Sequence, residues 1–339
     1  MRAFYITEPH SHELRELHEP KAADGEVLLK TRLIGFCGTD LSTFCGKNPL
    51  VSYPRIPGHE IAATIVARGS GVPEHFVTGA DVTVYPNTSC GICASCRRGR
   101  TNACKNNQTL GVQRDGALCD YFTIRWEKVC FGSGLSLREL SAVEPLAVGF
   151  HAVERSRVKP SDTVAVLGCG MVGLGAIAAA ERKGARVVAI DLDDKKLALA
   201  RQAGAQNVIN SRTANLRDAL GELTSGLGPD VVIEAVGSVQ TYRLAVEIVA
   251  HTGRVTYIGW TDEPVAYETK LFVHKELDIL GSRNYLNEFG PVIEMLSKGQ
   301  FPVEQMISET VPMERAGDAL RRWSESRQSF TKILVEVNP

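Results

Sequence analysis

Residues 163–180 read TVAVLGCGMVGLGAIAAA, a stretch without a charged side chain. The first five residues are apolar or β-branched, as in a buried strand. Gly168, Gly170 and Gly173 then interrupt the run. An uncharged segment of this length meets the lower limit for a membrane span. The glycines, and the charged residues at both ends of the segment, instead favour a strand, a tight turn and a buried helix.

The three glycines form the pattern G-x-G-x-x-G, and a second strand, RVVAI, follows the helix and ends at Asp191. A strand, this pattern, a helix and then an acidic residue are typical of a dinucleotide-binding βαβ unit. The first glycine makes the turn, the second lets the backbone approach a pyrophosphate, and the third lets helix and strand pack closely. The helix N-terminus at Met171 and Val172 would supply amide donors to the phosphates. Asp191 favours NAD over NADP because it would repel a 2′-phosphate, although Lys195 and Lys196 keep NADP open.

Short apolar segments follow at 206–209, 230–237 and 254–260, with helical stretches between them. This alternation predicts an α/β fold with a doubly wound parallel sheet. Ligands bind beyond the carboxyl ends of such strands, so we expect residues 236–238 and 258–260 to face the cofactor. The cofactor-binding residues predicted there are Val236, Gly237, Ile258 and Gly259.

The sequence CGICASCRRGRTNAC, residues 90–104, places four of the nine cysteines in one short loop. The odd cysteine count, and an opening sequence that does not read as a signal peptide, argue against a disulfide framework. The spacing C-x2-C-x2-C-x7-C suits zinc held by four thiolates, while an iron–sulfur cluster and no metal at all are the alternatives. Four sulfur ligands leave no open position on zinc, so this site would be structural. Its predicted ligands are Cys90, Cys93, Cys96 and Cys104.

Further metal-ligating side chains are scattered along the first half of the chain. Cys37 lies in GFCGTD, His59 and Glu60 in PGHE, and Glu144 in EPLAVGFHA. Each fragment alone is weak evidence. Together they offer a thiolate, an imidazole and carboxylates, which with a water form the open ligand set of a catalytic zinc. Asp40 is a candidate to orient the imidazole.

The length, composition and net charge of the chain limit the kinds of fold and binding partner that we expect. The chain has 339 residues, of which 44% are hydrophobic and 23% charged, and its formal net charge is −1. This length predicts two domains, and this composition predicts a large core. A net charge near zero gives no overall basic field for nucleic acid or an anionic membrane. We therefore expect neither nucleic acid nor a membrane as a partner. Because the opening sequence does not read as a signal peptide, we expect a cytoplasmic location.

The motifs GFCGTD, PGHE, the four-cysteine loop, EPLAVGFHA and GCGMVG occur in an order that resembles the zinc-dependent medium-chain alcohol dehydrogenases. Glu144 stands where the classical members carry cysteine, so the chain is most similar to the sorbitol, butanediol and sugar-acid dehydrogenases. The resemblance covers essentially the whole chain. It implies a chaperonin-10-like β domain with both zinc sites at 1–148, a Rossmann NAD-binding domain at 149–288, and a return to the first domain at 289–339. It also implies an active site between the domains and a homodimer or homotetramer.

The same resemblance assigns roles to residues. The implied ligands of the catalytic zinc are Cys37, His59, Glu60 and Glu144. One glutamate would bind directly and the other through water, and the sequence leaves open which. Thr39 would take the substrate proton. Many relatives end the proton relay at a histidine where this chain has Ser42, and serine does not titrate near neutral pH, so water or another group must complete it.

The substrate is indicated by GSRNYLNEF, residues 281–289, whose opening is similar to that of sugar-acid dehydrogenases of the L-galactonate 5-dehydrogenase type. Arg283 would bind a carboxylate, phosphate or hydroxyl group with its fork of donors, or equally hold the cofactor or the domain interface. The predicted reaction is hydride transfer from a secondary alcohol of a polyol or sugar acid to NAD. Sugar phosphates, butanediol and threonine-like amino alcohols are alternative substrates. A zinc-independent quinone reductase is disfavoured by the ligand set, and a non-catalytic NAD-binding protein is the alternative of another class.

Overall fold

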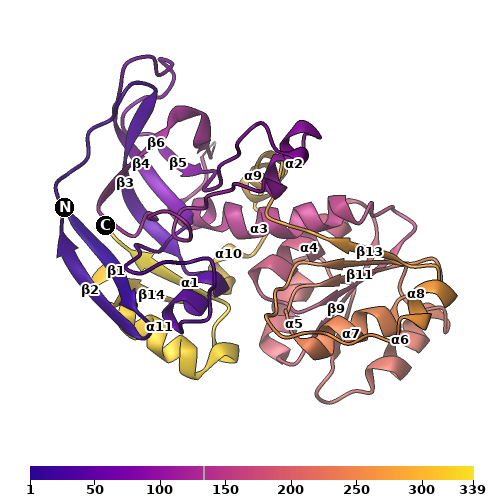
Figure 1. Ribbon diagram of the computed structural model, residues 1–339. Coiled ribbons are helices and arrows are strands. Elements are labelled where there is room, and N and C mark those ends of the chain that lie inside the picture. The colour runs from indigo at the N-terminus through magenta and orange to yellow at the C-terminus, as the bar shows by residue number, and fades with distance from the viewer. Residues whose placement is uncertain (133) are drawn as a thin grey trace. The chain divides into compact units, whose positions relative to one another are not determined.

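The chain divides into two compact units in a computed structural model that describes residues 1–132 and 134–339. The first unit consists of Met1–Glu144, Leu296–Lys298 and Val303–Pro339, and the second of Pro145–Met295 and Gly299–Pro302. Both termini lie in the first unit (Figure 1). The divisions fall a few residues away from the expected domain bounds because helices α3 (Leu137–Arg155) and α9 (Phe289–Ser297) continue through them.

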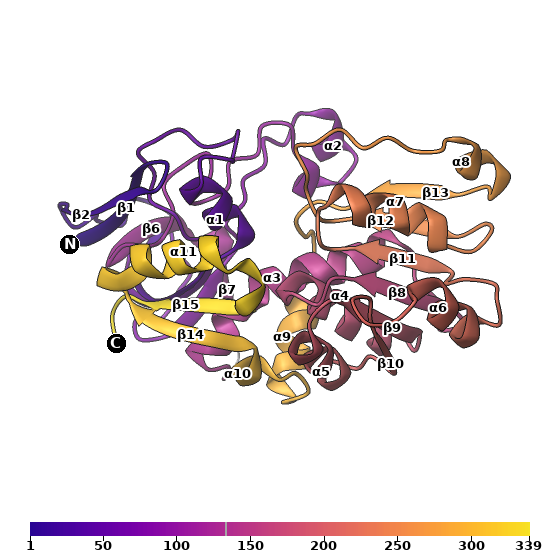
Figure 2. The same cartoon turned by 90° about the horizontal axis from the view of Figure 1, so that it is seen from below.

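The second unit is built on a six-stranded sheet with the order β10-β9-β8-β11-β12-β13. Each adjacent pair is parallel, and Figure 2 shows the strands from β13 at the top to β10 at the bottom. The strands are β8 (Thr163–Leu167), β9 (Arg186–Asp191), β10 (Asn207–Asn210), β11 (Val231–Glu234), β12 (Arg254–Tyr257) and β13 (Asp278–Gly281). The strand order reverses between β8 and β11, which confirms the Rossmann fold.

Helices cover both faces of this sheet. They are α4 (Met171–Arg182), α5 (Asp194–Gln202), α6 (Leu216–Thr224), α7 (Val239–Ile248) and the short α8 (Lys270–His274). Leu220 of α6 and Ala245 of α7 share one apolar cluster with Ala165 and Leu167 of β8. Right-handed crossovers place α4 and α5, which move along the sheet in the other direction, on the opposite face. Coverage of both faces explains why every residue of β8 is buried and why four of its five residues are apolar.

The uncharged run at 163–180 thus forms β8, a turn and most of α4. No helix in the described part of the chain has the length and apolarity that a bilayer crossing requires.

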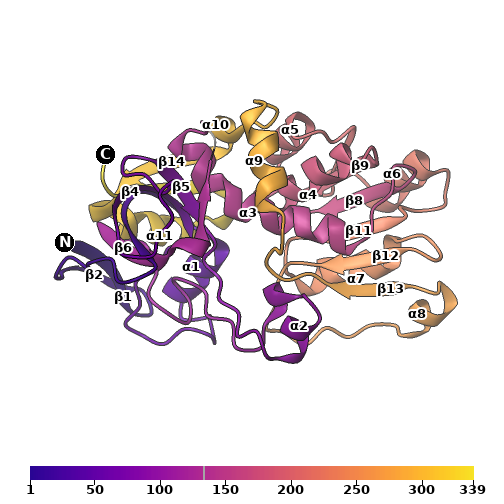
Figure 3. The same ribbon diagram turned by 90° about the horizontal axis from the view of Figure 1, so that it is seen from above.

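The first unit contains a seven-stranded sheet with the order β14-β15-β3-β4-β5-β7, and β6 also pairs with β3. The strands are β3 (Glu26–Gly35), β4 (Glu60–Arg68), β5 (Asp81–Val84), β6 (Tyr121–Arg125), β7 (Val129–Phe131), β14 (Ile307–Pro312) and β15 (Lys332–Glu336), and a separate pair is formed by β1 (Arg2–Glu8) and β2 (Ser11–Glu16). The helices of the returning segment are α10 (Val303–Met306) and α11 (Ala316–Glu325). Figure 3 shows this segment, in yellow, within the same unit as β4, β5 and β6.

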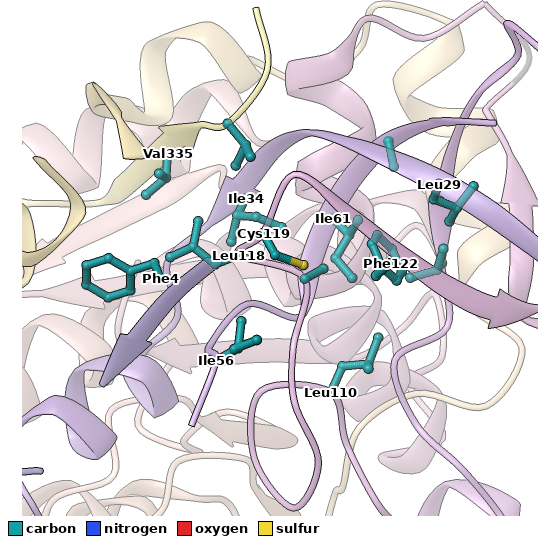
Figure 4. Close-up of a cluster of buried hydrophobic side chains, with 14 of the residues drawn as sticks. Phe4, Leu29, Ile34, Ile56, Ile61, Leu110, Leu118, Cys119, Phe122 and Val335 are labelled. Carbon is teal, nitrogen blue, oxygen red and sulfur yellow. The ribbon is translucent and has the colours of Figure 1, made fainter. Parts of the chain in front are cut away.

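The core of the first unit draws on strands from both ends of the chain. Phe4 of β1, Ile34 of β3, Ile61 of β4 and Val335 of β15 are almost completely buried in one cluster (Figure 4). Burying each such side chain contributes about 1.5–3 kcal/mol. The returning strand is therefore part of the core that supports β3 and β4, the two strands that flank the candidate metal ligands.

Candidate active site and metal centres

Cys37 lies where a strand changes into a helix. It follows β3 and Phe36 and is the N-cap of α1 (Gly38–Phe44). Its backbone N–H donates to Oδ2 of Asp40, three residues further, at 2.8 Å. An acidic side chain at this position satisfies an N–H group that the helix leaves unpaired. The segment CGTD thereby holds Cys37 at a fixed point beside β3.

Glu60 is the first residue of β4, and His59 directly precedes it. The preceding Gly58 has φ +103, a conformation that favours glycine, and its N–H donates to Oδ1 of Asp40 at 3.3 Å. Asp40 therefore joins the Cys37 segment to the His59 segment. Glu60 faces Gly35 across the β3–β4 pair, and a Cβ atom on Gly35 would lie 2.2 Å from Oε2 of Glu60. A larger residue at position 35 would displace the carboxylate of Glu60 from this position.

Cys37, His59 and Glu60 form what we call the catalytic cluster. One ligand atom from each lies within 4.8 Å of the others, and His59 and Glu60 are buried. Nδ1 of His59 is buried and has no hydrogen-bond partner among the described residues. Its distance to Oδ1 of Asp40 is 3.8 Å, which is too long for a hydrogen bond. A sulfur, a nitrogen and an oxygen ligand together with an unsatisfied buried imidazole fit a zinc ion.

The electrostatics around the cluster favour a cation. Burial lowers the pKa of His59, but Asp40, Cys37 and Glu144 more than offset this effect and raise that pKa well above 6.5. Burial raises the pKa of Glu144 to about 7, and Glu60 and Asp40 add to the rise. Burial also raises the pKa of Asp40. Several acidic groups thus share a region of low dielectric, where a bound metal ion would lower the cost of their charges.

Lys332 is a member of this region that sequence reasoning missed. It is the first residue of β15, is buried, and its Nζ forms an ion pair with Oε2 of Glu60. The same Nζ donates to the carbonyl oxygen of Phe36 at 2.9 Å. The available signal was a charged residue at the start of the otherwise apolar strand segment KILV. The returning strand therefore orients a carboxylate of the catalytic cluster.

Thr39 and Glu144 complete the predicted catalytic set. Oγ1 of Thr39 lies 3.7 Å from Sγ of Cys37, so its hydroxyl is adjacent to the cluster. Glu144 is a buried residue of α3, but it is not among the grouped ligand atoms of the described residues.

The four cysteines of residues 90–104 converge at a second centre. Their sulfur atoms lie within 4.8 Å of one another, and none of the nine cysteines forms a disulfide within the described chain. The backbone N–H of Cys90 points to Sγ of Cys104 at 3.3 Å. The hydroxyl of Ser95 contributes most to lowering the pKa of Cys93, to about 5, which favours the thiolate that binds metal. This loop can bind a structural zinc.

The glycine pattern has the geometry of a nucleotide-binding turn. Gly168 has φ +94, and a Cβ atom on Gly173 would lie 1.9 Å from the carbonyl oxygen of Gly168. A Cβ atom on Gly170 would meet no described atom within 4 Å, so this side of the turn is open. The carboxylate of Asp191 accepts from the backbone N–H groups of Cys169 at 2.7 Å, Leu192 at 2.7 Å and Asp193 at 3.1 Å.

Two turns follow β11 and β12 at the same edge of the sheet. They are residues 236–238 and 258–260, and the side chains of Val236 and Trp260 are 52% and 65% exposed. Beneath them Glu234, which sequence reasoning also missed, accepts from the N–H groups of the first turn. Arg283 lies in the second unit, between β13 and α9.

Comparisons with known proteins agree with this arrangement. Residues 23–131 match the alcohol dehydrogenase GroES-like domain, and residues 171–298 match the zinc-binding dehydrogenase family. The sorbitol dehydrogenase of Bacillus subtilis is 31% identical over 100% of this chain and 98% of its own length. The chain belongs to the zinc-type medium-chain alcohol dehydrogenases. It is an oxidoreductase of the zinc type with a GroES-like and a Rossmann part.

Other members of the family differ in substrate and cofactor. The 2-dehydro-3-deoxy-L-galactonate 5-dehydrogenase of Pseudoalteromonas atlantica is 32% identical over 93% of this chain and 92% of its own. An Escherichia coli CFT073 alcohol dehydrogenase solved with NADH has a TM-score of 0.91 and 29% identity, with 99% of both chains covered. A Sinorhizobium meliloti dehydrogenase solved with NADP has a TM-score of 0.91 and 28% identity over 99% of both chains.

Proposed function

We propose that this dehydrogenase transfers a hydride from a secondary alcohol of a polyol or sugar acid to NAD⁺. The observation that carries the proposal is the catalytic cluster: Cys37, His59 and Glu60 bring their ligand atoms within 4.8 Å of one another, beside Thr39 and Glu144. Similarity to a sorbitol dehydrogenase and a sugar-acid dehydrogenase supports the substrate class.

The catalytic cluster would hold the catalytic zinc. We assign Glu60 as its direct carboxylate ligand because Glu60 is grouped with Cys37 and His59, and Glu144 as the glutamate that acts through water. A zinc ion bound there would supply Lewis acidity that makes the substrate hydroxyl more acidic. The four-cysteine loop would hold a second, structural zinc.

The residues of the chain then handle the proton and the substrate. The hydroxyl of Thr39 would accept the proton of the substrate hydroxyl and release its own proton to water at the same time. A bound nicotinamide would supply the acceptor for the hydride of the carbinol C–H bond. Water carries the proton onward, because Ser42 stands where a titrating group would be needed. Arg283 is proposed to bind an anionic or hydroxyl group of the substrate.

NAD is the proposed cofactor because of Asp191. The Asp191 carboxylate is fixed by three backbone N–H groups at the end of β9, where it would accept from the adenosine ribose and repel a 2′-phosphate. We further propose a cytoplasmic location, because a reducing compartment keeps cysteines available as metal ligands. By resemblance to the family, we also propose a homodimer or homotetramer.

The test is reduction of NAD⁺ across a panel of polyols, aldonic acids, sugar phosphates, butanediol, threonine and simple alcohols, with NADP⁺ in parallel and a chelator control. Chelator-sensitive turnover of one polyol or aldonic acid with NAD⁺ is the expected result. Turnover that resists the chelator, or that occurs only with simple alcohols, would contradict the proposal.

A further inference from the structure

Glu234, the last residue of β11, is a buried carboxylate outside the catalytic cluster. Its exposed fraction is 0%. Its Oε1 accepts from the N–H groups of Val236 at 2.9 Å and Gly237 at 2.8 Å, and from the hydroxyl of Thr241 at 2.8 Å. Three donors on one oxygen hold the turn 236–238 and the start of α7 in a fixed position.

The backbone of the same residue fixes the neighbouring turn. The carbonyl oxygen of Glu234 accepts from the N–H groups of Ile258 at 2.9 Å and Gly259 at 3.2 Å. Glu234 therefore holds the turn 236–238 through its side chain and the turn 258–260 through its main chain.

The two turns also touch each other directly. A Cβ atom on Gly237 would lie 2.6 Å from the carbonyl oxygen of Trp260, and a Cβ atom on Gly259 would lie 2.2 Å from the nitrogen of Gly237. The hydroxyl of Tyr242 donates to the carbonyl oxygen of Gly259 and braces the second turn independently of Glu234. The result is one rigid surface of backbone groups built from two turns.

The second oxygen of Glu234 lowers the stability of the fold. Oε2 is buried without a hydrogen-bond partner among the described residues, and it lies 2.7 Å from where a Cβ atom on Gly259 would be. Burying a carboxylate with one oxygen unpaired carries a desolvation penalty that lowers the stability of the fold. The compensating effect is the fixed position of the two turns.

The surface that Glu234 supports carries two exposed apolar side chains, Val236 and Trp260. It lies beyond the carboxyl ends of β11 and β12, the edge at which such sheets bind ligands. Exposed apolar side chains next to fixed backbone carbonyl groups suit a flat ring that carries a carboxamide, because the ring needs apolar contact and the N–H groups of the carboxamide need acceptors.

We propose that Glu234 is a positioning residue for the nicotinamide half of the cofactor, and that it acts by holding turns 236–238 and 258–260 as one surface. This inference rests on the proposed function. The adenosine half would instead bind at Gly168–Gly173 and Asp191, so the two halves of the cofactor can be tested separately.

The experiment measures the dissociation constants of NADH and of ADP-ribose, which lacks nicotinamide, for the wild-type enzyme and for Glu234→Ala. We expect NADH to bind about tenfold more weakly to Glu234→Ala, while the affinity for ADP-ribose stays within about twofold. Glu234→Gln should keep most of the NADH affinity, because the amide oxygen can accept from the same three donors. Glu222→Ala, at an exposed residue of α6, is the matched control and should change neither affinity.

Two results would overturn the proposal: equal weakening of NADH and ADP-ribose, which indicates general damage, and unchanged affinity for both. If Glu234→Ala does not fold, Tyr242→Phe tests the same surface through its second brace and should also weaken NADH selectively. A wild-type enzyme that binds neither probe would refute the proposed function itself.

Discussion

Single residues decide the chemistry of the catalytic cluster, and they lie far apart in the sequence. The short segments CGTD and PGHE are joined by Asp40, whose two oxygens accept from the N–H groups of Cys37 and Gly58. Oδ1 of Asp40 also lies 3.8 Å from Nδ1 of His59, the imidazole that Asp40 is expected to orient. Asp40 therefore positions both ligand segments through their backbones.

Replacing Cys37 with serine should remove a thiolate ligand from the catalytic cluster. We expect turnover to fall by about 100-fold or more, since even outer residues of metal sites cost 10–100-fold, while NADH binding stays nearly unchanged. Steady-state kinetics and NADH titration measure the two effects. Cys45→Ser, a nearby free cysteine, is the control, and full activity of Cys37→Ser would refute the metal assignment.

At the scale of elements, most of the Rossmann strands were predictable because they carry short apolar runs. The segments at 163–167, 206–209 and 254–260 lie on or overlap β8, β10 and β12. The run at 230–237 extends past β11, which ends at Glu234, because the Glu234 carboxylate accepts from the N–H groups of Val236 and Gly237 and the chain turns there. Strand β13 has mostly exposed residues and gives little apolar signal.

Lys332 was not predictable as a partner of Glu60, since an ion pair between distant strands leaves no local pattern.

The packing of α3 on α4 depends on glycines. A Cβ atom on Gly175 of α4 would lie 2.6 Å from the carbonyl oxygen of Leu146, so Gly175→Ala should lower the free energy of unfolding by about 1–3 kcal/mol through overpacking. Gly221 lies within α6 and a Cβ atom there would meet no described atom within 4 Å. Gly221→Ala should therefore raise stability by about 0.5–1 kcal/mol. Urea unfolding checks both, and equal effects of the two changes would contradict this packing argument.

At the scale of the whole molecule, two metal centres of different build should differ in lability. Four thiolates enclose a zinc ion completely, whereas the catalytic cluster leaves a position open. A chelator should therefore remove one zinc per chain early, with loss of activity before unfolding, and the second zinc later. Metal analysis alongside circular dichroism follows both events. Simultaneous loss of both zincs, activity and fold would count against separate roles.

An ion pair and a hydrogen bond of Arg2 connect the N-terminal strand of the first unit to Asp120 and to the C-terminal segment. Arg2 pairs with Asp120 at 2.8 Å and donates to the carbonyl oxygen of Val337 at 3.1 Å. Burial raises the pKa of Asp120, but hydrogen bonds from Arg2 outweigh burial and lower it below 3.8. A carboxyl group with a lowered pKa stabilises the fold above its unfolded pKa, and this contribution is lost as pH falls through the folded value.

Asp120→Asn should therefore lower the free energy of unfolding by about 1–2 kcal/mol at pH 7, a value discounted for the partial exposure of Arg2. The difference from wild type should shrink as the pH falls below 4, where the wild-type carboxyl group also becomes neutral. Urea unfolding at pH 7 and pH 3 measures it. A difference independent of pH would show that the charge of Asp120 contributes nothing.

The second unit is inserted in the sequence between the segments of the first unit, and this order affects how the protein folds during synthesis. Residues 145–295 leave the ribosome before β14, β15 and Lys332 exist, because the chain emerges from its N-terminus. The nascent Rossmann sheet can thus close while the first sheet still lacks two strands and Glu60 still lacks its lysine. The candidate metal centre is consequently among the last parts of the protein to mature, and a chain stalled after the second unit would carry a Rossmann sheet without the completed centre.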